Sequence, residues 1–410
     1  MPVQSVIPLK CYCNNYPWGN QAAASLAARM CKAHNPDFTI EADKCYAEMW
    51  MATYPELPSY ALDSGEDLQQ ILNNNKEKLI GKTVLSKFGA DLPFLPKILS
   101  IAKALPLQIH PNIELSKKLH EEDPENFTDT NHKPEIAVAL SKFEVFVGFK
   151  PKEDIQKLME LDSLKQFLPS GDAGGEPTNE TLKKVCANML KASEDTVKEV
   201  EDALAKLTKE QLGQNQSYIL DLLPRLQAQY TKADPGTLVA LILMNFLTLS
   251  AGEALYVPAD GIHAYLSGDI VECMARSNNV LNTGFCPPAE RNSIDLFTKV
   301  LTFKVHDPKE PILQRLDSEK SSSGRTAAFK PPMSEFNMLV TELQKGEQET
   351  VKPVNGPGIM FVTRGAGDMR AGGDAFQPKE GSIYFVGQGV DVELNASSDD
   401  GLTVYRAYAE

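Results

Sequence analysis

LPLQIHPN (residues 105–112) and HKPE (residues 132–135) are the two motifs around which the rest of the chain is organised. Gln108 and His110 are two positions apart, so on a β-strand their side chains point to the same face. A Gln oxygen, an imidazole and a carboxylate such as Glu135 can each bind zinc, although glutamine is an uncommon ligand. A fourth candidate ligand is His263 in YVPADGIHAYLSGD (256–269). We therefore predict one metal site where these residues converge inside a β-barrel.

The spacing leaves a second interpretation open, because a single histidine on an apolar strand is more often a hydrogen-bonded core residue than a metal ligand. Q-x-H is also a weaker signal than H-E-x-x-H, in which both histidines share one face of a helix. Mixed oxygen and nitrogen ligands would accept manganese or cobalt as well as zinc. The motif alone therefore indicates a divalent metal without deciding which one.

Six blocks of sequence resemble the type I phosphomannose isomerase family and occur in the family's order. They are NYPWG (15–19), AEMWMATYPELPS (47–59), LPFLPKILS (92–100), LQIHPN (107–112), NHKPEIAVAL (131–140) and PADGIHAYLSGDIVECMA (258–275). The resemblance implies an aldose–ketose isomerase that interconverts mannose 6-phosphate and fructose 6-phosphate by proton transfer between C1 and C2, feeding GDP-mannose biosynthesis. It also implies one zinc ion per chain, held by Gln108, His110, Glu135 and His263.

The same resemblance implies a mixed, mainly β fold: a cupin-like jelly-roll catalytic domain with an inserted α-helical domain and a second, C-terminal jelly roll. We expect the catalytic jelly roll in residues 1–150 and 251–325. We expect the helical insertion domain in residues 151–250 and the C-terminal jelly-roll domain in residues 326–410.

Local patterns predict where the helices of the insertion lie. The spacing of apolar residues predicts helices over 182–207 and 219–230. The apolar run 237–249 is too short to cross a membrane, so it predicts a buried helix. SGDAGGEP (170–177) predicts a flexible loop, and the stretch 315–330, rich in Ser and Lys, predicts a linker or mobile loop.

The resemblance assigns roles beyond the metal. Lys133 is a candidate for substrate contact or proton relay, with His132 beside it, although a lysine here could equally be a solvated surface charge. Asn282 stands where the family has an arginine taken to be catalytic. The expected substrate-binding residues are Trp18, Glu48, Lys97, Arg276 and Glu272. Glu272 could instead be a hydrogen-bonded strand carboxylate, or a residue that orients the metal ligands.

The stretch SNNVLNTGFCPP (277–288) departs from the family pattern S-D-N-x-x-R-A-G-x-T-P-K. Five positions where the family has His, Ser, Asp, Arg and Lys are, in that order, Tyr54, Pro106, Asn278, Asn282 and Pro288. The family's Ser and Lys are linked to phosphate binding. Asparagine supplies neither a guanidinium fork nor a positive charge, and losing one charge-assisted contact costs roughly 1.5–3 kcal/mol.

These replacements leave three functions in competition. The first is a zinc-dependent mannose-6-phosphate isomerase. The second is a diverged paralogue that acts on another sugar, for example an unphosphorylated one. The third is a catalytically silent protein that binds zinc and a sugar phosphate. Arg276 and Arg291 are nearby cations that could replace the missing charges.

Composition narrows the class of partner. The chain has 410 residues, 42% of them hydrophobic and 23% charged, with a net charge of −14, which argues against general nucleic-acid binding. It has neither a run of about 20 apolar residues nor the pattern of a signal peptide. Seven cysteines without a C-x-x-C motif fit reduced thiols in the cytoplasm. We therefore expect a cytoplasmic monomer with a small sugar-phosphate substrate and with no nucleic-acid or membrane partner.

Overall fold

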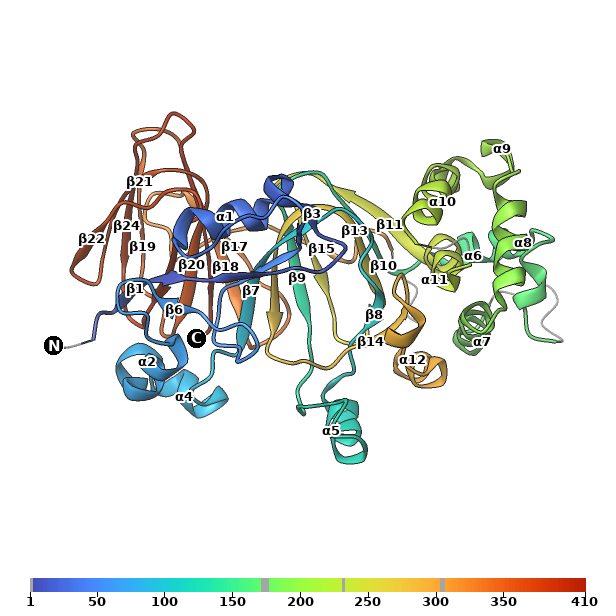
Figure 1. Cartoon of the computed structure of the whole chain (residues 1–410), viewed down its shortest axis with the longest axis horizontal. Helices are drawn as coiled ribbons and strands as arrows, with labels where there is room; N and C mark the ends of the chain where they lie inside the picture. Colours follow the sequence, from blue (N-terminus) through green and yellow to red (C-terminus); the bar gives the residue numbers. More distant parts are fainter. Residues whose placement is uncertain (1–2, 171–176, 231–232, 303–306) are drawn as a thin grey trace.

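The computed structural model describes residues 3–170, 177–230, 233–302 and 307–410. The fold is mainly β and is elongated (Figure 1). A β-sandwich formed largely by C-terminal residues lies at one end, a curved sheet occupies the middle, and a group of helices lies at the other end. Five of the six sequence blocks described above contain a strand of the central sheet, and NYPWG (15–19) follows β2 (Tyr12–Asn14) as a turn.

The central sheet has the strand order β15-β12-β9-β13-β7-β5-β2, and β8, β10, β11 and β14 join it through β13. Most of its strands are buried on both faces because they lie between the sandwich and the helices. The strands are β2 (Tyr12–Asn14), β5 (Glu48–Trp50), β7 (Phe94–Ile101), β8 (Leu107–Ile109), β9 (Glu135–Ala139), β10 (Phe143–Phe149), β11 (Met244–Leu249), β12 (Ala254–Val257), β13 (His263–Ala275), β14 (Leu281–Gly284) and β15 (Ile312–Leu313).

Strand β13 connects the two halves of this sheet. Its first residues pair with β8 and β10, and its later residues pair with β7 and β9. Val145 pairs with Tyr265 while Glu144 pairs with Ser267, so Leu266 is an extra residue, a β-bulge. A regular strand would place His263 and Glu272, nine positions apart, on opposite faces. The bulge reverses the alternation and turns both side chains into the same interior.

The helical end of the molecule has its own apolar core, which continues into the back of the central sheet. Pro224 lies inside α10 without ending it. Between residues 150 and 243 the helices are α6 (Lys152–Met159), α7 (Asn179–Leu190), α8 (Glu194–Leu204), α9 (Lys209–Leu212), α10 (Tyr218–Gln229), α11 (Pro235–Leu238) and the π-helix Val239–Leu243.

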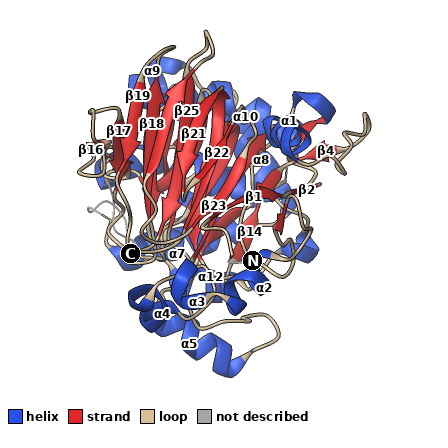
Figure 2. Ribbon diagram, turned by 90° about the vertical axis from the view of Figure 1, so that its left-hand side faces the viewer, coloured by secondary structure: helices blue, strands red, loops and turns tan. Residues whose placement is uncertain are grey.

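The opposite end is a sandwich of an eight-stranded and a four-stranded sheet around a separate core (Figure 2). We call it the C-terminal sandwich. The larger sheet contains β16 (Leu316–Asp317), β17 (Thr326–Phe329), β18 (Asn337–Leu343), β25 (Leu402–Tyr408), β20 (Gly358–Gly365), β23 (Ile383–Val386), β1 (Val6–Lys10) and β6 (Tyr60–Ala61). The smaller contains β19 (Gln348–Val351), β24 (Val392–Ala396), β21 (Gly367–Ala371) and β22 (Asp374–Phe376). The first strand of the chain, β1, therefore pairs with β23 from the last part of the chain.

Three of the local predictions need correction. The predicted helix 182–207 is two helices, α7 and α8, because Ser193 caps a new helix by accepting a hydrogen bond from the backbone of Thr196. The predicted helix 237–249 turns into strand β11 at Met244 and pairs with β10. An apolar run of this length fits a buried strand as well as a helix.

The stretch 315–330 is also not a simple linker, because it contains β16 and β17. The buried Glu349 carboxylate accepts hydrogen bonds from the backbone of Ser322, Ser323 and Arg325 and holds the polar segment between these strands. A short helix, α1 (Leu26–His34), was not predicted. Residues 171–176 of the predicted loop 170–177 lie outside the described residues.

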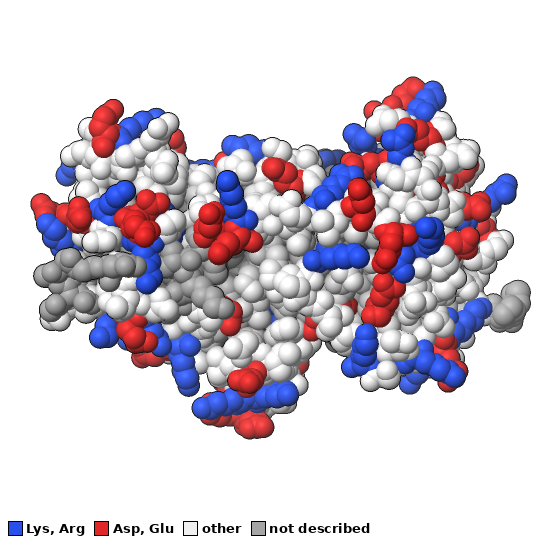
Figure 3. Space-filling model, turned by 180° about the vertical axis from the view of Figure 1, so that it is seen from behind, with Lys and Arg blue, Asp and Glu red and all other residues white. Residues whose placement is uncertain are grey.

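Charges of both signs are interspersed on the face seen in Figure 3. Within the described part of the chain, every helix is too short or too polar to cross a bilayer.

The helices are attached to the central sheet by an ion-pair network at Glu144 of β10. Its carboxylate accepts from Arg225 of α10, from Lys142 at 2.9 Å and from Ser267 at 2.8 Å. Burial would raise the pKa of Glu144, but these hydrogen bonds lower it to about 2. The folded state therefore holds this carboxylate in its charged form.

Replacing Glu144 by Gln should lower the free energy of unfolding by about 1–3 kcal/mol at pH 7, the usual contribution of charge-assisted hydrogen bonds. A lowered pKa stabilises the folded state above the unfolded value of 4.5, and this contribution is lost as the pH falls toward 2. The difference between wild type and E144Q in urea unfolding should therefore shrink from pH 6 to pH 3. The exposed Glu199 gives the control E199Q, and an equal loss in both variants would contradict the role of Glu144.

Candidate metal and substrate site

The predicted metal ligands come together through the register of three strands. Gln108 of β8 lies directly opposite His263 of β13 on one side and Asn282 of β14 on the other. Directly opposed residues in an antiparallel pair share a face. His110 follows β8 at once, and Glu135 opens β9. Each candidate ligand is therefore at or near a strand end, where the backbone fixes its position.

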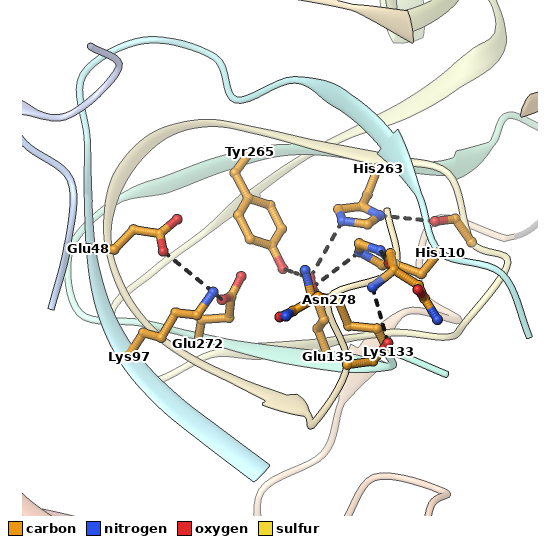
Figure 4. A network of polar contacts seen from close by, with 12 residues as sticks. Glu48, Lys97, His110, Lys133, Glu135, His263, Tyr265, Glu272 and Asn278 are labelled. Atoms are coloured by element: carbon orange, nitrogen blue, oxygen red, sulfur yellow. Dashed lines mark hydrogen bonds and ion pairs between the residues drawn. The ribbon is translucent and has the colours of Figure 1, made fainter. Parts of the chain in front are cut away.

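The side chains of His110, Glu135 and His263 form a compact, fully buried cluster (Figure 4). Their candidate ligand atoms all lie within 4.8 Å of one another. The Nε2 atoms of His110 and His263 lie 3.2 Å and 3.5 Å from the two oxygens of Glu135. Two nitrogens and a carboxylate at this spacing are a suitable donor set for a divalent cation.

Hydrogen bonds to the backbone set the tautomers of both histidines. His110 Nδ1 lies 2.9 Å from the carbonyl of Asn279, and His263 Nδ1 lies 2.9 Å from that of Gly261. A carbonyl only accepts, so Nδ1 carries the proton and Nε2 keeps its lone pair. Both Nε2 atoms are buried, and neither has a hydrogen-bond partner among the described residues. This is the arrangement of a metal-binding imidazole oriented by an outer partner.

The local charges favour the forms that bind metal. Burial would raise the pKa of Glu135, but Lys133 and His110 hold it well below its usual range. Burial, with Lys133 nearby, lowers the pKa of His110 to about 4. Glu135 is therefore a carboxylate and His110 a neutral imidazole at pH 7. Tyr265, two positions after His263, donates to Glu135 at 3.3 Å.

A second polar cluster lies across the interior, on the other side of Tyr265 (Figure 4). Lys97 of β7 is 2.9 Å from Glu272 and 3.5 Å from Glu48, and all three side chains are buried. Trp50 donates to Glu48 at 2.6 Å, and its ring lies under the Lys97 ammonium at 5.1 Å. Three of the predicted substrate-binding residues are thus brought together on neighbouring strands.

This cluster contains one carboxyl group that is suited to proton transfer. Burial, together with Glu135 and Glu48, raises the pKa of Glu272 to about 7 despite the opposing effect of Lys97. Lys97 remains charged, because Glu272 and Glu48 raise its pKa although burial alone would lower it. Glu272 can therefore take up and release a proton near neutral pH.

The two residues of HKPE predicted as catalytic have different surroundings. The Lys133 Nζ lies 3.5 Å from a Glu135 oxygen, beside the metal cluster. The His132 Nε2 lies 2.6 Å from Glu335, which lies in the loop between β17 and β18 of the C-terminal sandwich. This contact joins the HKPE segment to the C-terminal sandwich.

The positions that depart from the family pattern are spread around the interior. Asn282 shares a face with Gln108, and its Oδ1 is buried without a hydrogen-bond partner among the described residues. Asn278 is exposed and donates to Glu56 at 3.0 Å. Arg276 lies 4.6 Å from the centre of the Tyr54 ring and donates to Thr53.

A cavity of about 470 Å³ lies between the ends of β8 and β14 and the helices. Trp18, Pro106 and Pro288 line it, and so do Tyr230 and Phe285. Pro106 is two residues before Gln108, and Phe285 directly follows β14. The two prolines that replace the family's Ser and Lys thus line one cavity next to β8, the strand that carries the candidate ligand Gln108.

The ionisable residues that line this cavity do not give it a net positive charge. Arg291 lies 2.9 Å from the buried Asp234 and also donates to the Cys286 carbonyl. Lys103 is exposed, and Glu194 and Glu290 add negative charge. Three acidic residues therefore accompany two basic ones. The importance of Asp234 was not predicted, because only the fold brings it beside Arg291.

Comparisons with known proteins give one consistent result. The family model described as "Phosphomannose isomerase type I, catalytic domain" matches residues 6–152. The mannose-6-phosphate isomerase of Saccharomyces cerevisiae is 35% identical, and that of Candida glabrata 36%, each over 96% of both chains. The apo mannose 6-phosphate isomerase of Salmonella typhimurium has a TM-score of 0.82 at 25% identity and covers 100% of both chains. A structure described as holo and zinc bound has a TM-score of 0.80 at 25% identity, covering 99% of this chain.

Replacing His263 by Ala should remove most of the bound zinc, measured by elemental analysis after dialysis against a weak chelator. Loss of an outer hydrogen-bond partner alone lowers metal affinity about 10–100-fold, so loss of a ligand should lower it further. The control is H120A, because His120 lies on α5, away from the cluster, and its Nδ1 contacts the backbone carbonyl of Phe127. Wild-type zinc content in H263A would exclude His263 as a ligand.

Proposed function

Since this chain belongs to the type I phosphomannose isomerase family, we propose that it is a zinc-dependent aldose–ketose isomerase that interconverts mannose 6-phosphate and fructose 6-phosphate. The observation that carries the proposal is the pair of buried Nε2 atoms aimed at Glu135. Relatives of nearly the same length carry the name of this activity. We also propose the finer architecture: a cupin-like jelly roll with a helical insertion and a second jelly roll.

The proposed ligands are Gln108, His110, Glu135 and His263. A bound zinc ion would polarise the carbonyl and hydroxyl oxygens at C1 and C2 of the sugar as a Lewis acid. Lys133, beside Glu135, is placed to stabilise negative charge on a substrate oxygen. Asn282, with its unpaired buried oxygen on the Gln108 face, would accept a hydrogen bond from a sugar hydroxyl.

We assign the proton transfer between C1 and C2 to Glu272. Its pKa of about 7 lets one carboxyl group take the proton from one carbon and return it to the next. Glu272 and the metal cluster face the same interior, on either side of Tyr265. Lys97 and Glu48 set the charge around Glu272 and are therefore positioning residues.

Replacing Glu272 by Gln should lower kcat about 10²–10⁴-fold, the usual contribution of a general base, with zinc content unchanged. In the wild type, kcat should rise with pH as Glu272 loses its proton. Glu48 raises the pKa of Glu272, so the E48Q variant should shift this limb of the pH profile to lower pH. Full activity in E272Q, or an unshifted limb in E48Q, would contradict the assignment.

The cavity beside β8 and β14 favours a second candidate function, the isomerisation of an unphosphorylated sugar. Proline has no side-chain donor, so Pro106 and Pro288 offer none to a phosphate. Arg291 is already paired with Asp234. A dianionic phosphate would also approach Glu194 and Glu290. The neutral hydroxymethyl group of an unphosphorylated sugar needs no cationic partner in this cavity and is not repelled by the two glutamates.

Turnover of mannose 6-phosphate and of free mannose should be compared on zinc-loaded protein, with zinc quantified in the same sample. The first function predicts a higher kcat/KM for mannose 6-phosphate, and the second predicts a higher kcat/KM for mannose. If the zinc-loaded protein turns over neither sugar, the third function remains, that of a catalytically silent protein that binds zinc and a sugar phosphate.

The double variant P106S/P288K tests the cavity itself. Each restored charge-assisted contact contributes roughly 1.5–3 kcal/mol, or about 10–100-fold, so kcat/KM for mannose 6-phosphate should rise at least tenfold. The value for mannose should stay within about twofold, which serves as the internal control. An unchanged ratio of the two values would show that the cavity does not receive the 6-position of the sugar.

A further inference from the structure

The HKPE segment is held by a carboxylate that comes from the C-terminal sandwich. Glu335 lies in the loop between β17 and β18, is only 6% exposed, and accepts a hydrogen bond from His132 Nε2 at 2.6 Å. Burial would raise the pKa of Glu335, but the hydrogen bonds from His132 and from the backbone of Ser334 hold it below its usual value. Glu335 is therefore a charged acceptor for the His132 ring at neutral pH.

The loop that carries Glu335 is itself anchored on the central sheet. Phe336 is 1% exposed, and its ring centroid lies 6.4 Å from that of Phe94 at the start of β7. Met333 packs against the same apolar core. Glu335 lies between these two packed residues in the chain, so the loop holds its carboxylate at a fixed place beside the HKPE segment.

Two other hydrogen bonds attach the ends of the HKPE segment to the central sheet. The side chain of Asn131 donates to the carbonyl of Arg276 at 2.9 Å, and the carbonyl of Pro134 accepts from the backbone of Ala275 at 3.0 Å. Both attachments lie at the end of β13 or directly after it. Lys133 belongs to the part of the segment between them, and the hydrogen bond to the sandwich restrains this middle part.

The backbone of this middle part determines where the Lys133 ammonium group lies. Its Nζ is 3.5 Å from a Glu135 oxygen, at the end of a flexible four-carbon chain. Glu135 itself is fixed by strand pairing with Val257 on one side and Met274 on the other. A shift of the backbone before Glu135 would therefore move Lys133 more than the metal ligand. A misplacement of about 1 Å can lower the rate of a reaction about 10²-fold.

We propose that Glu335 is a positioning residue for the reaction: it holds His132 and thereby keeps the Lys133 ammonium group beside the metal cluster. This inference rests on the proposed function, in which Lys133 stabilises negative charge on a substrate oxygen. It gives the C-terminal sandwich a part in catalysis, because the sandwich supplies the carboxylate that restrains the HKPE segment.

The first experiment measures kcat, KM and zinc content with the sugar that the wild type turns over. The variant E335A should lower kcat about 10–100-fold, with KM within about twofold and with zinc content unchanged. The amide oxygen of E335Q can accept the same hydrogen bond, so this variant should regain most of the loss. In the H132A background, E335A should cause no further loss, because the partner is already absent.

The control is E342A, which breaks an ion pair with Arg315 in the same sandwich and should keep the wild-type kcat. A wild-type kcat in E335A would overturn the proposal. So would an equal loss from E335A with and without His132, because Glu335 would then not act through His132.

The second experiment does not depend on turnover, so it separates this inference from the proposed function. Crystal structures of the zinc-loaded wild type and of zinc-loaded E335A are compared at Lys133. In E335A, Nζ should move away from Glu135 or lose its order, while His110, Glu135 and His263 keep their places. An ordered and unmoved Lys133 would overturn the proposal at any level of activity. A displaced Lys133 in a chain that turns over neither mannose 6-phosphate nor mannose would contradict the proposed function but support the positioning of Lys133 by Glu335.

Discussion

The arrangement of the site depends on two hydrogen bonds from imidazole Nδ1 atoms to backbone carbonyls. They fix the rings of His110 and His263 so that both Nε2 lone pairs face the Glu135 carboxylate. Without a cation, this arrangement leaves two buried nitrogens unpaired beside a buried negative charge. Such a cluster is costly in an empty fold and favourable around a divalent metal. The constraint thus comes from the backbone, and the metal chemistry follows from it.

The same constraint organises the charges of the interior. Glu48, Glu135 and Glu272 are buried, and among the described residues the ammonium groups paired with them are those of Lys97 and Lys133. The excess of carboxylates raises the pKa of Glu272, and a divalent cation would turn the local balance positive. An interior with bound zinc would therefore attract the electron-rich oxygens of a sugar at C1 and C2. It would also keep one carboxyl group that can exchange a proton.

Sequence reasoning succeeded where a side chain and its backbone position are determined locally, and it failed where they depend on distant pairing. The alternation in Q-x-H predicts that Gln108 and His110 share a face, and the strand pairing places Gln108 directly opposite His263. The apolar run 237–249 does not itself indicate that part of it will pair with β10 as a strand. The bulge at Leu266 was likewise invisible, although it decides that Glu272 faces the metal cluster. The contact of His132 with Glu335 spans 203 positions and has no local signal.

The positions of the replaced residues explain how a metal site can persist while substrate recognition changes. The candidate metal ligands are held by strand register, whereas Pro106 precedes β8 and Pro288 follows β14 in a connecting segment. Connecting segments accept substitution at low cost to the fold, and the Arg291–Asp234 pair keeps the cavity wall intact without the family's lysine. Asn282 is the exception, because it lies on β14 beside Gln108. An asparagine in place of the family's arginine removes a positive charge from the surroundings of the metal site but keeps the strand register. We therefore expect this replacement to affect the chemistry and not the folding.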